Sequence, residues 1–230
     1  MENYIKQREE YADKAKLSNE VALLKSRYYE KDPFLYGTPD KEYIFRSVAE
    51  KVPGFFLKYI DTILVGKFDF LEEKDLDALY KDGSIYISND KDSDLDVVDD
   101  IIHEIAHAVE ENNKLLIYSD GQIEREFIAK RSRLYFLLKE NGFSEEVDFY
   151  DFEKTEYDEP FDMFLYQEVS YPLLGNLVSG LFCSPYGATS LREYFANCFE
   201  FLFMENDPGY VNKVSPAVFL KIEEVLNNVN

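Results

Sequence analysis

One segment near the middle of the chain constrains the fold most, because its two faces differ sharply in polarity. Aliphatic side chains recur there at helical spacing, and this face must meet a core. They are Val98, Ile101, Ile102, Ile105 and Val109. The opposite face carries Asp96, Asp100, His103, His107 and Glu111. We therefore predict a helix over residues 95–111 that packs on one side and lines a cleft on the other.

The polar face of this helix contains the sequence His103-Glu104-Ile105-Ala106-His107. Two imidazoles four residues apart project from the same side of a helix and can share one tetrahedral Zn²⁺ ion. Glu104 stands beside them, where a carboxylate can act as the general base for a water molecule. The pattern predicts a zinc site with His103 and His107 as ligands. The alternative is a solvated polar stripe without a metal.

A catalytic zinc ion needs a third protein ligand, and the chain has only two histidines. The third ligand must therefore be Glu, Asp or Cys. Glu193 is the best candidate, although it follows Ser190 at the spacing of a capping box, which is its alternative role. Glu200 lies two turns further along nearly the same helix face, and Glu124 and Glu126 are weaker options. Spacing alone does not choose among these four glutamates.

A second motif lies near the C-terminal end, where Tyr186-Gly187 is followed by Leu191-Arg192-Glu193-Tyr194-Phe195-Ala196. Together with the histidine helix, it resembles the anthrax lethal factor-like zinc peptidases, which include the bacterial Pro-Pro endopeptidases. The resemblance covers residues 84–110 and 183–204. It implies a zincin fold with a gluzincin-type site, in which Glu193 is the third zinc ligand. It also implies that Tyr186, seven residues before Glu193, assists catalysis by stabilising the oxyanion.

The sequence departs from this family's pattern at two places. Glu193 follows His107 by 86 residues, a longer gap than the family has, which implies an inserted helical region over residues 113–182. Asn197 stands where the family has a second glutamate. Neither departure touches a residue that would bind the metal.

The function implied is that of a zinc-dependent metallopeptidase, which hydrolyses peptide bonds with a metal-activated water. We expect a polypeptide substrate, and we expect the strand at residues 84–88 to be an edge against which the substrate pairs. One rival is a catalytically silent zincin-like component of a larger assembly such as a phage virion. Glu104 speaks against that rival, because a structural zinc needs no general base. Another is a toxin or effector peptidase.

The remaining sequence predicts an α+β fold, predominantly helical, in a single zincin-like domain over residues 1–230. We expect a small sheet, the motif helix and a helical C-terminal lobe. The acidic loop at residues 90–96 is interpreted as capping the start of the motif helix. The predicted first part is an accessory helical segment over residues 1–52, with helices at 3–29 and 40–51. The sheet and the motif helix follow over 53–112, and the inserted region over 113–182 contains a helix at 121–138. The third-ligand helix and the C-terminal helix occupy residues 183–230.

Charge and composition restrict the partners of this chain. Its formal net charge of −21 repels nucleic acid and anionic membranes, so neither is an expected partner. The sequence has neither a long apolar run nor a signal-peptide pattern at its start, so we expect a cytoplasmic or virion-associated protein. Cys183 and Cys198 lie in a largely apolar stretch, and we expect reduced thiols there.

Overall fold

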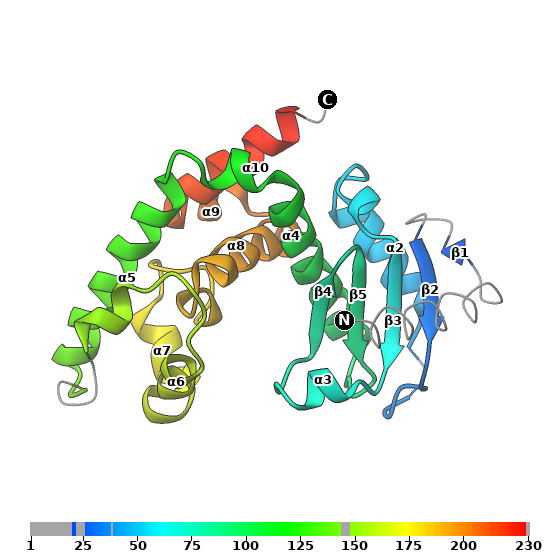
Figure 1. Cartoon of the computed structure of the whole chain (residues 1–230), viewed down its shortest axis with the longest axis horizontal. Coiled ribbons are helices and arrows are strands. Elements are labelled where there is room, and N and C mark those ends of the chain that lie inside the picture. Colours follow the sequence, from blue (N-terminus) through cyan, green and yellow to red (C-terminus); the bar gives the residue numbers. More distant parts are fainter. Residues whose placement is uncertain (1–19, 22–25, 38, 144–147, 229–230) are drawn as a thin grey trace. The chain divides into compact units, whose positions relative to one another are not determined.

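The computed structural model describes residues 20–21, 26–37, 39–143 and 148–228 (Figure 1). The fold is α+β and predominantly helical, as predicted. The chain divides into two compact units, residues 1–109 and 110–230. Helix α4 (Asp94–Tyr118) contributes residues to both units. The prediction of one continuous zincin-like domain stays a prediction.

The first unit contains a five-stranded mixed sheet with the strand order β1-β2-β3-β5-β4 (Figure 1). Strands β2, β3 and β5 are mutually parallel, whereas β1 and β4 run antiparallel to their neighbours. The strand bounds are β1 (Glu20–Val21), β2 (Ser26–Glu30), β3 (Thr62–Gly66), β4 (Ala78–Lys81) and β5 (Ser84–Ser88).

The predicted strand at residues 84–88 is confirmed as β5, but its prediction as an edge is wrong. β5 lies between β3 and β4, and β4 forms the edge. Asp82 and Gly83 both have positive φ, 48° and 77°. Two such residues form the tight turn that joins antiparallel strands of a hairpin, so β4 folds back onto β5.

The predicted helix over residues 3–29 is wrong where the structure describes it, because β1 and β2 lie there; residues 3–19 are outside the described part. In β2, Ser26 and Tyr28 are buried and Arg27 is exposed, which is the alternation of a strand. Its residues pair with β3 in parallel register. Tertiary pairing thus overrides the helix-favouring composition of the preceding residues. The segment at residues 1–52 is therefore not merely accessory, since it supplies strands of the sheet.

The sheet buries both of its faces within the first unit. On one face, side chains of the sheet converge with those of α2 (Lys41–Lys51) and α4 around a small cavity, which is lined in part by Tyr28, Ile63, Ile87, Ile44 and Ile101. On the other face, the short helix α3 (Asp69–Glu72) completes a cluster formed by Leu64, Phe68, Leu71 and Tyr86. Burial on both faces explains the uninterrupted apolar runs Ile63-Leu64-Val65 in β3 and Ile85-Tyr86-Ile87 in β5.

The second unit is helical, as predicted for the C-terminal lobe. None of the described helices is long and apolar enough to cross a membrane. The predicted helix over residues 121–138 is confirmed as α5. The elements are α5 (Gln122–Glu140), a 3₁₀ helix (Phe149–Glu153), α6 (Glu159–Met163), a π-helix (Phe164–Ser170), α7 (Tyr171–Leu177), a one-turn 3₁₀ helix η4 (Tyr186–Ala188), α8 (Leu191–Glu205), α9 (Pro208–Val214) and α10 (Pro216–Asn228).

A buried arginine holds several segments of the second unit together. Arg131 of α5 is only 1% exposed. Its guanidinium donates hydrogen bonds to the backbone carbonyls of Asp151, Lys154 and Thr189, and it lies 4.1 Å from the ring centre of Phe161. Since Thr189 precedes α8, these bonds join α5 to the start of that helix.

Replacing Arg131 by Met should lower the free energy of unfolding by roughly 3 kcal/mol, because three buried carbonyls lose their donor. Urea denaturation followed by circular dichroism measures the change. Arg133→Met is the matched control, because Arg133 is exposed on the same helix. It should change stability by less than about 0.5 kcal/mol. Equal losses in the two variants would contradict the role of Arg131.

Candidate metal centre

Helix α4 forms where the sequence predicts it and extends further, to Tyr118. The hydroxyl oxygen of Ser93 accepts a hydrogen bond from the amide of Asp96 (3.2 Å), which caps the first turn. The helix is interrupted at Asn113, whose φ and ψ are −124° and 19°. The predicted core face is confirmed, since its five aliphatic side chains are at most 1% exposed.

The middle of the polar face of α4 is shielded from solvent, whereas Asp96 and Glu111 near its two ends are exposed. His107 is 8% exposed and Glu104 is 5% exposed, while His103 is half-buried. A solvated stripe of polar residues would expose these side chains. Their burial therefore disfavours that alternative for the histidine motif.

The helix that carries Glu193 begins at the residue predicted to cap it. Ser190 has an extended backbone, and its hydroxyl oxygen accepts a hydrogen bond from the Glu193 amide at 3.2 Å. Behind this first turn, α8 buries a run of side chains that includes Tyr194, Phe195 and Phe199. The cap and the buried side fix Glu193 in the first turn of α8.

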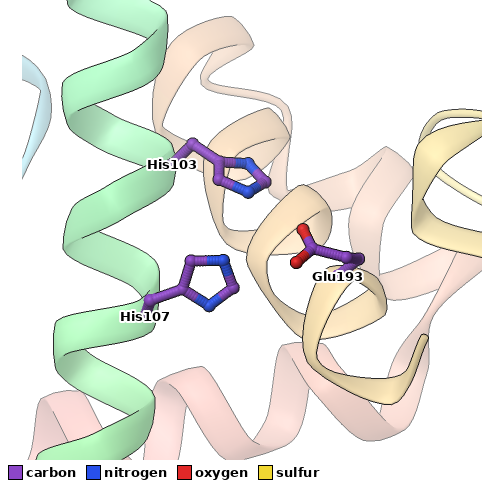
Figure 2. Close-up of side chains that lie close together, drawn as sticks. All are labelled: His103, His107 and Glu193. Atoms are coloured by element: carbon purple, nitrogen blue, oxygen red, sulfur yellow. The ribbon is translucent and has the colours of Figure 1, made fainter. Parts of the chain in front are cut away.

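Figure 2 shows His103, His107 and Glu193 with their side chains directed toward one another. Each offers one ligand atom, and these three atoms lie within 4.8 Å of one another. A tetrahedral zinc ion with bonds of about 2.1 Å separates its ligand atoms by about 3.4 Å. Small side-chain rotations therefore suffice to bring the three ligand atoms to that separation. Two imidazoles and one carboxylate are a donor set that zinc accepts. The group could therefore hold a metal ion.

The other glutamates considered as ligands do not belong to this group. Among the residues that the structure describes, the potential metal-binding group contains Glu193 and neither Glu200 nor Glu124. The Glu126 carboxylate instead accepts hydrogen bonds from the Tyr194 hydroxyl (2.6 Å) and the Ala217 amide (3.0 Å). Glu126 thus has a structural role within the second unit.

The predicted general base is anchored to the edge of the sheet. One carboxylate oxygen of Glu104, Oε2, accepts a hydrogen bond from the backbone amide of Tyr80 in β4. This bond restrains the carboxylate on the motif helix. This contact is not predictable from the side chains, because any residue except proline supplies a backbone amide.

Tyr186 lies in η4, in the same unit as Glu193. Burial raises the pKa of its phenol, and the nearby carboxylates of Glu193 and Asp162 raise it further. Tyr186 therefore stays protonated and can donate a hydrogen bond. Asp162 also accepts a hydrogen bond from the Tyr157 hydroxyl at 2.9 Å, and the Tyr171 hydroxyl lies 3.5 Å from its other oxygen. No local pattern predicts the contacts of Asp162 with Tyr157 and Tyr171, because these three residues are scattered through the predicted inserted region.

Asn197, which departs from the resembled family's pattern, lies next to the turn that carries Tyr186. Asn197 is 4% exposed, and its Oδ1 accepts a hydrogen bond from the Ser184 hydroxyl. Within the described part of the chain, its Nδ2 has no hydrogen-bond partner. A Cβ at Gly187 would lie 3.4 Å from the Asn197 side chain, so the turn packs closely against this residue.

The two cysteines of this region are free, as predicted, although Cys198 is buried and Cys183 is only partly buried. Their sulfur atoms lie 3.4 Å apart.

No protein-family model, curated protein or solved structure matches this chain.

Glu193→Ala should weaken zinc binding by more than about 100-fold, a larger loss than changes outside the ligand set usually cause. Competition with a chromophoric chelator measures the dissociation constant. Glu200→Ala is the matched control, because Glu200 lies on the same helix but outside the candidate group. It should bind zinc as the unchanged protein does. The reverse result would identify Glu200 as the third ligand.

Proposed function

We propose that this protein is a zinc-dependent metallopeptidase with a zincin-like fold, which hydrolyses peptide bonds. The observation that carries the proposal is the convergence of His103, His107 and Glu193 on one point. The buried carboxylate of Glu104 stands next to the first histidine in the sequence. A metal ligand set and an adjacent general base are the two parts that metal-assisted hydrolysis needs.

In this proposal, each chemical task of the hydrolysis falls to a named group of the chain. Zinc held by His103, His107 and Glu193 would supply Lewis acidity, which activates water and polarises the scissile carbonyl. Glu104 takes a proton from the attacking water and returns it to the leaving amine. Tyr186 donates a hydrogen bond to the oxyanion, a role that its raised pKa favours because the phenol stays protonated.

An extended polypeptide is the substrate class that the sheet favours. Among the strands that the structure describes, β4 is the last on its side of the sheet, and an edge strand is where an extended peptide can be added to a sheet. Glu104 is bonded to the amide of Tyr80 in that same strand, which brings the general base to the edge. The net charge of −21 favours neutral or basic polypeptides over acidic ones.

The second candidate function is a catalytically silent zincin-like component of a larger assembly. The bond between Glu104 and the Tyr80 amide favours it, because this bond gives Glu104 a structural role that needs no catalysis. A glutamine can accept the same hydrogen bond but cannot act as a base. Replacing Glu104 by glutamine therefore separates the two functions.

Glu104→Gln should lower peptidase activity by roughly 10²- to 10⁴-fold while zinc content and thermal stability stay the same. Cleavage of a diverse peptide library, detected by mass spectrometry, measures activity, and elemental analysis measures zinc. Glu111→Gln, at an exposed position of the same helix, is the control and should leave activity unchanged. If the unchanged protein binds zinc but cleaves no peptide, the silent component becomes the better interpretation.

Tyr186→Phe should lower kcat by roughly 10²-fold, because the oxyanion loses one hydrogen-bond donor. Zinc affinity should not change, since the phenol is not in the candidate ligand set. Steady-state kinetics on a cleaved library peptide, with a zinc titration of the same sample, make the measurement. Tyr150→Phe removes an exposed hydroxyl from the same unit and serves as control. Undiminished kcat in Tyr186→Phe would leave Tyr186 a packing role only.

A further inference from the structure

A buried carboxylate on α4, which the proposed mechanism does not use, joins two other side chains of the second unit. Glu110 is 5% exposed. Its Oε1 accepts a hydrogen bond from the Tyr118 hydroxyl at 2.8 Å, and its Oε2 accepts one from Arg192 Nε at 3.0 Å. Both oxygens of the carboxylate therefore have a donor.

The positions of the paired residues connect this network to the candidate metal ligands. Glu110 follows His107 by three residues on α4, which is less than one turn, and the interruption at Asn113 lies beyond it. Arg192 directly precedes Glu193 in the first turn of α8. One ion pair thus joins the turn of α4 after His107 to the turn of α8 that carries Glu193.

The burial of the Glu110 carboxylate makes its contacts with Tyr118 and Arg192 energetically important. A buried carboxylate without partners would be costly, so Glu110 requires its two donors. The Tyr118 phenol stays protonated, because burial raises its pKa and Glu110 raises it further. The Arg192 side chain is 58% exposed, which screens its charge and moderates the strength of the pair. The restraint on the two helices comes mainly from the burial of Glu110.

We propose that Glu110 and Arg192 are positioning residues of the metal centre, whose ion pair holds the first turn of α8 so that the Glu193 carboxylate stays at the ligand position. The inference rests on the proposed function, since it takes His103, His107 and Glu193 as the ligands. Groups that orient metal ligands typically change metal affinity by 10- to 100-fold when they are lost. A residue that only stabilised the fold would change the unfolding transition without changing the affinity of the folded protein.

The test compares zinc affinity in Glu110→Gln, Arg192→Gln and the double variant. Each single variant should raise the zinc dissociation constant by about 10- to 100-fold. The double variant should be no weaker than the weaker single variant, because both changes remove the same restraint. The visible absorption of bound Co²⁺ reports ligand geometry and should change in all three variants. Chelator competition and the Co²⁺ spectrum need no peptidase activity.

Glu126→Gln is the matched control, because Glu126 is another carboxylate of the second unit that accepts a hydrogen bond from a tyrosine hydroxyl. It should lower thermal stability but leave the zinc dissociation constant and the Co²⁺ spectrum unchanged. If Glu110→Gln does not fold, Arg192→Gln decides alone, since the Arg192 side chain is largely exposed.

The possible results separate this inference from the proposed function. Unchanged zinc affinity in the folded Arg192→Gln variant would overturn the positioning role while the metal centre stands. So would strictly additive losses in the double variant, or an equal loss of affinity in Glu126→Gln. If the unchanged protein binds no zinc, both the metal centre and the positioning role fall.

Discussion

Burial of the aliphatic face of α4 is the constraint on which the rest of the site depends. Full burial of one aliphatic side chain stabilises a fold by about 1.5–3 kcal/mol, and five such side chains share this face. Rotation of the helix about its axis would expose them to water and bury carboxylates in their place. The hydrophobic effect therefore fixes the direction in which His103 and His107 project, before any metal ion contributes.

Local signals explain why the sequence predicts the two helices of the site. The period of the aliphatic residues defines α4, and Ser190 defines the start of α8 through its hydroxyl. Periodicity alone does not choose the candidate third ligand, because Glu193 and Glu200 lie on nearly the same helix face. The family resemblance implies Glu193, and Glu193 is the glutamate that the structure groups with the two histidines.

Contacts between distant residues explain most of what the sequence analysis missed. β2 forms because it pairs with β3, which lies more than thirty residues further along the chain. The Asp82-Gly83 pair is a local signal of a hairpin turn, and it explains why β4 pairs with β5. The role of Glu110 is not predictable from the histidine motif, because its partners, Tyr118 and Arg192, lie outside that motif.

The cap at Ser190 has a consequence for the position of the candidate third ligand. Glu193 lies in the first turn of α8, where backbone amides have no partner within the helix, and its own amide is bonded to the Ser190 hydroxyl. Helices fray from their ends, so the precision with which Glu193 is held depends on how firmly one serine hydroxyl closes the first turn. The geometry of the candidate metal site and the integrity of one helix end therefore depend on the same hydrogen bond.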